Sequence, residues 1–157
     1  MTYVTEGSRT KSECPFCTQA VHAAKLPGLI VRAGHQAYVT LNLHPYNNGH
    51  LLILPYRHVA DLDELETDEA NELISLLTES RTVLEQEFTP DGYNIGMNLG
   101  TAAGAGIPGH VHFHIVPRWN GDTNFMPVTG DVKVLPETLG QTHDRLVTAW
   151  KLSLIHI

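Results

Sequence analysis

Charged residues and cysteines are both scarce in this chain of 157 residues. Only 17% of the residues are charged, and 10 Lys plus Arg stand against 17 Asp plus Glu, a formal net charge of −7. This balance excludes the basic surface that grips nucleic acid or anionic lipid without specificity, so we expect neither a nucleic-acid nor a membrane partner. Two cysteines cannot form a disulfide framework. Any phosphate-bearing ligand is therefore expected to be small and held by local contacts.

Long apolar segments are also lacking. No run approaches the roughly 18 residues of a membrane span, and residues 1–9 show neither the apolar core nor the cleavage pattern of a secretory signal. A cytoplasmic protein is therefore expected. The length suits one domain. We predict a flexible arm over residues 1–12, a folded domain over 13–152 and a tail of uncertain structure over 153–157.

The pattern of apolar residues predicts an α+β fold. Short apolar runs predict strands, and residues 67–88 have helical spacing, with Thr67 as a usable N-cap and Ile74 among the residues of the apolar face. A second helix is expected over about 136–152. One long helix among hairpin-like links favours a mostly antiparallel sheet over alternating βαβ units. The predicted strands cover residues 29–31, 37–41, 50–54, 93–99 and 110–117, and Gly34-His35 is a plausible turn between the first two.

Histidine is abundant, because its ten copies equal all the Lys and Arg together. His110, His112 and His114 alternate with apolar residues, so on a strand the three imidazoles would share one face. The first and last would lie about 13 Å apart, which is too far for two ligands of one zinc ion. The three histidines are therefore expected to serve separate roles.

Two further local motifs carry chemistry. The small-residue link before the triad can let backbone amides approach an anion, and we expect a phosphate cradle at Gly104, Gly106 and Ile107. Cys14 and Cys17 have the spacing of half a zinc site or of a redox pair, and two unrelated thiols are a third reading.

The segment His110-Val111-His112-Phe113-His114-Ile115-Val116 resembles the signature of the histidine triad (HIT) family, in which histidines alternate with apolar residues. Supporting matches span residues 14–135. The stretch Pro117-Arg118-Trp119-Asn120-Gly121-Asp122-Thr123-Asn124-Phe125 is similar to the bacterial branch of diadenosine tetraphosphate phosphorylases, or ATP adenylyltransferases. The resemblance implies a single domain with a five-stranded antiparallel sheet and flanking helices, paired as a homodimer with a shared sheet.

The resemblance also implies a nucleotide site. His112 would be the nucleophile that forms a covalent nucleotidyl-histidine, and His114 would contact phosphate oxygens or the leaving group. Asn98 and the amides of Gly106 and Ile107 would stabilise charge on the phosphate oxygens. Asn42 would bind the ribose, with a turn-capping role as the alternative. His50 would lie near the phosphates or beside the triad, with an ordinary strand-end histidine as the alternative.

A zinc site follows from the same resemblance. Cys14 and Cys17 match a cysteine pair that joins two histidines in zinc-containing relatives, and the matching histidines here are His58 and His110. This Cys₂His₂ set would bind structural zinc and fix the strand that carries His112 while leaving that side chain free.

The predicted function is nucleotidyl transfer or hydrolysis on a dinucleoside polyphosphate, with diadenosine tetraphosphate cleaved by phosphate or by water. One alternative keeps the site and takes a nucleoside phosphoramidate or an adenylylated amine as substrate. A second alternative is a nucleotide-binding regulatory module without catalysis, against which the intact His112 and His114 argue.

Overall fold

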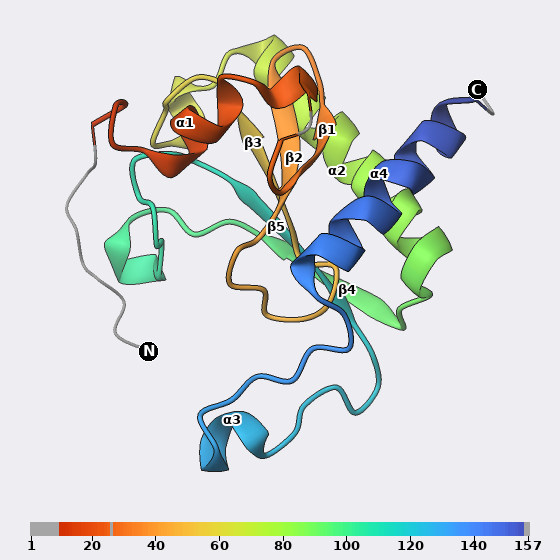
Figure 1. Cartoon of the computed structure of the whole chain (residues 1–157). Helices are drawn as coiled ribbons and strands as arrows, with labels where there is room; N and C mark the ends of the chain where they lie inside the picture. Colours follow the sequence, from red (N-terminus) through yellow and green to blue (C-terminus); the bar gives the residue numbers. More distant parts are fainter. Residues whose placement is uncertain (1–9, 26, 156–157) are drawn as a thin grey trace.

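A five-stranded antiparallel sheet forms the centre of the molecule (Figure 1). The structure is a computed structural model and describes residues 10–25 and 27–155. Along the sheet the strands follow the order β1-β2-β3-β5-β4, and every neighbouring pair is antiparallel. The α+β fold with an antiparallel sheet is thereby confirmed. The strands are β1 (Ile30–Ala33), β2 (Ala37–Leu41), β3 (Leu51–Pro55), β4 (Gly92–Gly96) and β5 (Phe113–Arg118).

Helices cover both faces of the sheet (Figure 1). The two long helices, α2 and α4, pack on one face, where apolar residues of the strands form the larger core with theirs. The short helix α1 lies on the other face over a smaller apolar cluster that includes Tyr38, Leu52 and Leu54. The sheet is therefore buried on both sides, which explains why β2 and β3 are buried along their whole length. The α-helices are α1 (Pro15–Ala20), α2 (Thr67–Phe88), α3 (Met126–Thr129) and α4 (Leu139–Ile155), and 3₁₀ turns cover Ala23–Lys25, Leu62–Glu64 and Thr101–Ala103.

Helix α2 has the predicted bounds, but two details of the prediction are wrong. Glu66 rather than Thr67 is the N-cap residue, and it forms a capping box with Glu69. Ile74, expected on the core face, is 53% exposed, whereas Leu76 is buried. Apolar spacing locates the face only to within about one residue's rotation, and the crossing of α2 over the strands decides which side chains are covered.

The strand that carries the histidines begins later than the sequence predicts. β5 starts at Phe113, so the strand prediction is wrong for residues 110–112. Beyond the Ile53–Phe113 pair the chain leaves β3, and the amide of Val111 donates to the carbonyl of Val59 at 2.7 Å. The ring of His110 is bonded to the carbonyl of Pro55 at 2.9 Å. These contacts with the end of β3 and the loop after it replace the strand ladder.

The remaining elements deviate at their ends. β4 is shorter than the predicted strand over 93–99, and α4 runs to Ile155 instead of ending near residue 152. The expected tail over 153–157 is thus helical as far as Ile155, and residues 156–157 lie outside the described residues. Most of the expected arm, residues 1–9, also lies outside them, so the domain bounds stay a prediction.

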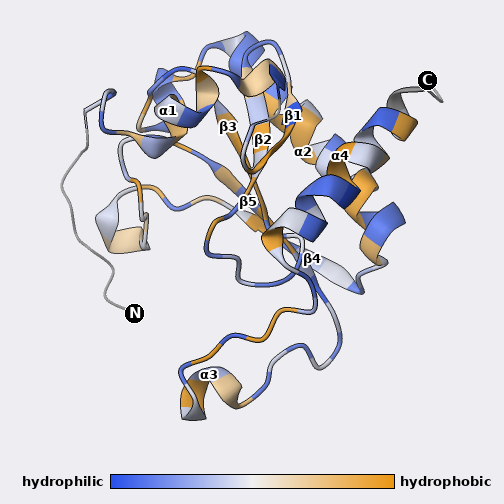
Figure 2. Ribbon diagram, viewed as in Figure 1, coloured by the Kyte–Doolittle hydropathy of each residue, from blue (hydrophilic) through white to orange (hydrophobic). Residues whose placement is uncertain are grey.

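The apolar residues of the strands and of helices α2 and α4 gather where these elements pack together (Figure 2). None of the helices in the described part of the chain is long and apolar enough to cross a membrane. The expected cytoplasmic location stays a prediction.

A hydrogen-bonded clamp joins the turn between β1 and β2 to helix α2. The carboxylate of Glu72 accepts hydrogen bonds from the backbone amides of His35, Gln36 and Ala37. A Cβ at Gly34 would lie 2.8 Å from both Glu72 Oε1 and the Ala37 carbonyl oxygen, so this close approach requires glycine. The clamp satisfies three turn amides that the strand ladder does not use.

We expect Glu72→Ala to lower the free energy of unfolding by about 1–2 kcal/mol, because hydrogen bonds to a charged acceptor are lost and turn amides lose their partner. Asn71→Ala, at an exposed position of the same helical turn, should stay within about 0.5 kcal/mol of the wild type. Urea denaturation of both variants measures the difference. Equal stability of the two variants would show that water replaces the carboxylate without cost.

Candidate active site

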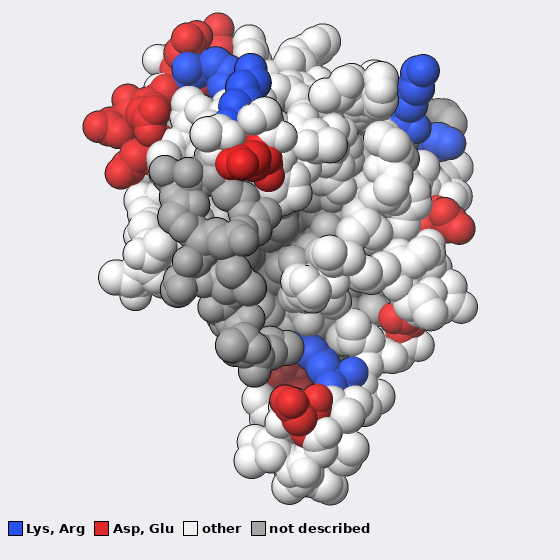
Figure 3. Space-filling view, turned by 60° about the vertical axis from the view of Figure 1, so that its left-hand side comes forward, with Lys and Arg blue, Asp and Glu red and all other residues white. Residues whose placement is uncertain are grey.

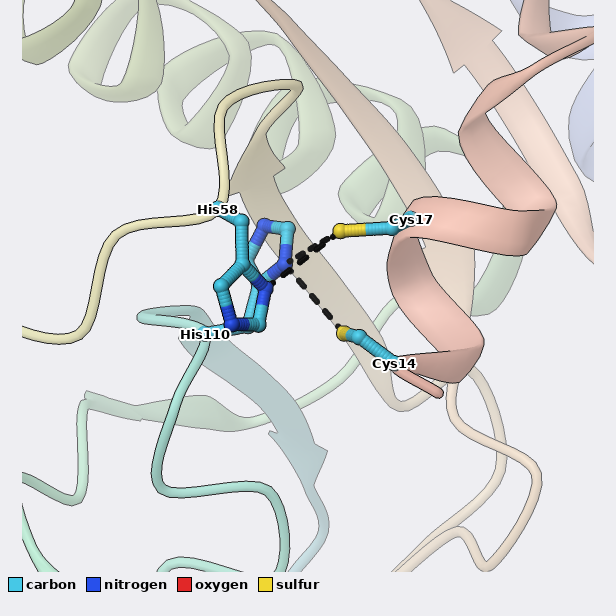
Figure 4. Close-up of side chains that lie close together, drawn as sticks. All are labelled: Cys14, Cys17, His58 and His110. Atoms are coloured by element: carbon cyan, nitrogen blue, oxygen red, sulfur yellow. Dashed lines mark hydrogen bonds between the residues drawn. The ribbon is translucent and has the colours of Figure 1, made fainter. Parts of the chain in front are cut away.

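Two cysteines and two histidines meet at one end of the sheet (Figure 4). Cys14 caps helix α1 and Cys17 lies within it, whereas His58 follows β3 and His110 precedes β5. One ligand atom from each residue lies within 4.8 Å of those of the other three. The predicted metal set is therefore brought together from three distant segments of the chain.

The geometry of this cluster fits zinc. The sulfur of Cys14 lies 3.5 Å from Nδ1 of His110, and the sulfur of Cys17 lies 3.4 Å from Nδ1 of His58. In a tetrahedral site with Zn–S of about 2.3 Å and Zn–N of about 2.0–2.1 Å, sulfur and nitrogen are separated by about 3.6 Å. Both pairs have this spacing without any rearrangement.

Hydrogen bonding prepares His110 as a ligand. Its Nε2 lies 2.9 Å from the carbonyl oxygen of Pro55, which can only accept, so the ring proton is on Nε2 and the lone pair on Nδ1 faces the thiols. Burial lowers the pKa of His110 to about 4, which keeps the ring neutral. Burial, followed by the neighbouring Cys14, raises the pKa of Cys17 to about 11. A bound cation is what would favour the thiolate forms in this buried place.

His112 has a defined tautomer. It is 7% exposed, and its Nδ1 lies 2.8 Å from the carbonyl oxygen of His110. Since a carbonyl only accepts, Nδ1 carries the proton and Nε2 keeps the lone pair. Burial lowers the pKa of His112, and the ring packs edge-on against Phe16 at 5.2 Å between centroids. His112 is therefore a neutral imidazole with a free nitrogen in a fixed orientation.

A hydrogen-bond relay sets the proton of His114. The amide of Tyr46 donates to Nδ1 of His50 at 3.0 Å, so His50 carries its proton on Nε2, which lies 2.9 Å from Nδ1 of His114. His114 must then carry its own proton on Nε2. This atom is buried and has no hydrogen-bond partner among the residues that the structure describes. An N–H donor is thus held ready beside His112, whose ring centroid is 4.9 Å away.

The relay residues stay neutral over a wide pH range. Burial, followed by the charge of a protonated His114, lowers the pKa of His50 to about 3. Burial, followed by a protonated His112, lowers the pKa of His114 to about 4. Each ring therefore keeps one donor and one acceptor nitrogen at neutral pH.

Asn42 lies beside this relay. Its side-chain nitrogen is 3.4 Å from Nδ1 of His50, and its side-chain oxygen accepts from the amide of His44 at 3.0 Å. The second contact is an Asx turn, the alternative role that the sequence allows. Asn42 thus caps the turn and borders the relay at the same time.

The glycine-rich link uses some of its amides internally. The amide of Gly104 donates to the carbonyl of Thr101 at 3.0 Å, and Gly104 has a φ of +85°, which favours glycine. Within the part of the chain that the structure describes, the amides of Gly106 and Ile107 have no such partner. These two amides, and not that of Gly104, stay available to an anion.

A pocket of about 500 Å³ opens at the His114 end of the triad. Asn98 lines it together with His114, whereas Asn42, His50 and the residues of the link do not. Sequence reasoning missed several polar residues of its wall, although Arg118 and Asp122 were part of the matched motif. The polar lining consists of Tyr46, Asn47, Asn94, Asn98, His114, Arg118, Asp122, Thr123, Asn124 and Lys133.

A salt bridge shapes the floor of this pocket. Arg118 contacts the carboxylate of Asp122 through two nitrogens, at 2.6 and 2.7 Å, and donates to Asn94 with the third. Asn47 donates to the same carboxylate at 2.8 Å. The Arg118 guanidinium holds the pKa of Asp122 well below its usual range. The loop after β5 is thereby fixed against β4 and the loop before β3.

Comparisons with known proteins agree on one family. A family model described as HIT domain matches residues 24–121. An AP-4-A phosphorylase of Mycobacterium tuberculosis is 44% identical over 136 residues, which span 87% of this chain and 69% of that protein. A bis(5'-nucleosyl)-tetraphosphatase (asymmetrical) of Schizosaccharomyces pombe is 33% identical over 111 residues, which span 71% of this chain and 55% of that protein.

The fold has relatives among solved structures. A zinc-bound histidine triad family protein from Mycobacterium smegmatis superposes with a TM-score of 0.75 at 21% identity, covering 94% of this chain and all of that one. A histidine triad nucleotide-binding protein from Sulfolobus tokodaii superposes with a TM-score of 0.70 at 23% identity, covering 88% and 93% of the two chains. These likenesses concern the fold.

Proposed function

Because this chain belongs to the HIT domain family, as its triad motif predicts, we propose that it transfers a nucleotidyl group from a dinucleoside polyphosphate through a covalent intermediate on His112. The observation that carries the proposal is the pair of complementary nitrogens, a free lone pair on His112 and an unpartnered N–H on His114. The 44% identity to an AP-4-A phosphorylase supports diadenosine tetraphosphate as the substrate.

The first step is an in-line displacement at phosphorus. Nε2 of His112 attacks the α-phosphorus, the bond from this phosphorus to the bridging oxygen breaks, and the rest of the substrate leaves with the electron pair of that bond. The N–H of His114 donates a hydrogen bond to the leaving oxygen. The amides of Gly106 and Ile107 and the side chain of Asn98 would stabilise the non-bridging oxygens. Asn42 would bind the ribose.

The second step returns the enzyme to its starting state. An acceptor oxygen attacks the same phosphorus, the P–N bond to His112 breaks, and the lone pair returns to Nε2. Orthophosphate as acceptor yields a nucleoside diphosphate, and water yields a monophosphate. The identity of the acceptor therefore distinguishes a phosphorylase from a hydrolase.

The test is to incubate the protein with diadenosine tetraphosphate, with and without phosphate, and to separate the products. ADP together with ATP, formed only when phosphate is present, supports phosphorolysis, whereas AMP with ATP in its absence supports hydrolysis. Tight binding of AMP without turnover or labelled enzyme would contradict catalysis and favour the regulatory-module alternative. Turnover of an adenosine phosphoramidate, without turnover of diadenosine tetraphosphate, would favour the alternative in which the substrate is a nucleoside phosphoramidate or an adenylylated amine.

We also propose a structural zinc ion on Cys14, Cys17, His58 and His110. When bound, the ion would supply a crosslink between helix α1, the segment that follows β3 and the segment that precedes β5. His110 joins this crosslink to the catalytic group, because its carbonyl oxygen orients His112. The zinc-bound relative from Mycobacterium smegmatis supports this assignment.

A homodimer with a shared sheet is proposed as well. β4 is an edge strand, so one row of its backbone groups lacks a neighbouring strand, and Ile95 in it is 50% exposed. We expect light scattering to give twice the chain mass of 17.3 kDa, and Ile95→Lys to shift the protein towards the monomer, since a charge would be buried at the pairing edge. A wild-type protein that stays at the mass of one chain at micromolar concentration would contradict the dimer.

A further inference from the structure

The pocket beside His114 contains a cation that the steps above do not use. Lys133 lies in the segment between α3 and α4, and its Nζ is 5.9 Å from the centroid of the Tyr46 ring. The Tyr46 ring in turn stacks on His114, with 5.9 Å between centroids and 12° between planes. Lys133, Tyr46 and His114 therefore follow one another along the pocket wall.

The charge balance of the pocket favours an anion. Asp122 is the one acidic residue of the lining, and Arg118 engages both of its oxygens. In the described ranges, 10–25 and 27–155, none of the ion pairs within 4.0 Å includes Lys133. The lining thus carries two cations against one carboxylate, although the whole chain carries −7. Partial burial, followed by Arg118, lowers the pKa of Lys133, and the more distant carboxylate of Asp122 offsets part of this effect.

The remaining polar groups suit phosphate. Asn98, Asn124 and Thr123 bring amide and hydroxyl donors to the wall, which His114, with its buried and unpartnered Nε2, also lines. In Figure 3 a few blue atoms meet red ones where the lobe containing α3 joins the body, and most of the visible surface around them is uncharged. One cation without a close ion pair, surrounded by neutral donors, suits a small anion rather than a polyanionic surface.

The stereochemistry of the reaction assigns this place to two phosphates in turn. In an in-line displacement the leaving group departs on the side opposite to His112, and the acceptor of the second step must enter from that same side. His114 lines the pocket and His112 does not. A phosphate chain whose α-phosphorus faces His112 can therefore extend past His114 towards Lys133.

We propose that this pocket is a phosphate subsite in which Lys133 holds first the departing polyphosphate and then the orthophosphate that discharges nucleotidyl-His112. The inference rests on the proposed function and deepens it, because it makes Lys133 the residue that favours phosphate over water as acceptor. In the second step an orthophosphate oxygen forms the new P–O bond, the P–N bond to His112 breaks, and ADP leaves. Water in the same place would give AMP.

The test compares Lys133→Gln with Lys133→Arg and with Lys151→Gln, which removes the same charge from an exposed position of α4. Diadenosine tetraphosphate is the substrate, and ADP and AMP are measured over a phosphate titration. We expect Lys133→Gln to raise the phosphate concentration for half-maximal ADP formation by about fivefold, as for one partly exposed charge pair, and to raise the share of AMP. Lys133→Arg should restore ADP formation, and Lys151→Gln should match the wild type. The difference should shrink at high ionic strength.

A second measurement separates the two phosphates. The burst of ATP released in the first turnover without phosphate reports on the departing polyphosphate, and the titration reports on orthophosphate. A slower burst or a weaker phosphate dependence in Lys133→Gln supports the subsite and names its occupant. Wild-type values for both would overturn it.

Calorimetry with inorganic triphosphate keeps the inference testable if the wild type shows no turnover, an outcome that would refute the proposed function alone. Binding by the wild type that weakens in Lys133→Gln and not in Lys151→Gln supports the subsite. Equal binding by all three proteins overturns it.

Discussion

His112→Ala is expected to lower the turnover of diadenosine tetraphosphate by at least about four orders of magnitude, the usual cost of removing a covalent nucleophile. The reason is that the fixed Nε2 lone pair is lost, and no other imidazole nitrogen in the described part of the site has the same orientation. The measurement is steady-state product formation, together with radiolabel retained on the denatured protein from α-labelled substrate.

His22→Ala is the matched control for this variant, because His22 is exposed and belongs to neither the triad nor the metal cluster. It should retain full turnover and full labelling. His112 also packs against Phe16, so thermal unfolding must show that His112→Ala remains folded. A folded His112→Ala protein that still cleaves the substrate and carries label would refute the assignment of the nucleophile.

Cys14→Ser is expected to have the largest effect on stability. Removing one ligand leaves three donors in a buried place, and losing a structural metal costs several kcal/mol of folding free energy. For a domain of this size, a loss of about 4 kcal/mol corresponds to a fall in Tm of roughly 10 °C or more. Differential scanning calorimetry measures the shift, and metal analysis should find about one zinc per wild-type chain and less in the variant.

The same variant separates structure from chemistry. Because the contact of Cys14 within the triad is with His110 and not with the proposed nucleophile His112, the turnover of the Cys14→Ser protein that remains folded at low temperature should fall less than that of His112→Ala. His22→Ala serves again as the control for zinc content and Tm. Folded wild-type protein without zinc, together with an unchanged Tm in Cys14→Ser, would contradict the metal assignment.

Local patterns predicted much of the fold. The helix over residues 67–88 was predicted with its bounds because its apolar spacing and terminal signals lie within one segment. The strand prediction over 110–117 was wrong for its first three residues. Alternation of side chains fits any extended segment, and it does not reveal that His110 and Val111 are bonded to Pro55 and Val59 instead of continuing the ladder.

The site shows the same division. The structure gives the three histidines different surroundings, since His110 faces the thiols, the ring of His112 is bonded to the carbonyl of His110, and His114 is bonded to His50; their separate roles stay a prediction. The triad motif did not predict that Lys133 lines the pocket, because Lys133 lies 19 residues after His114 in a segment without regular structure. Only the folding of that segment over Tyr46 brings it to the pocket.

Residue types and their spacing along the chain already show which chemistry is available: alternating imidazoles, a thiol pair, a glycine-rich link and an acidic overall charge. Residue type and short-range periodicity are local properties, so they can be read along the chain. The tertiary structure alone decided which nitrogen of each histidine carries its proton, because the carbonyls of Pro55 and His110 and the amide of Tyr46 make that choice through space. It also decided the burial that keeps these rings neutral, since desolvation depends on segments that pack together from distant parts of the chain.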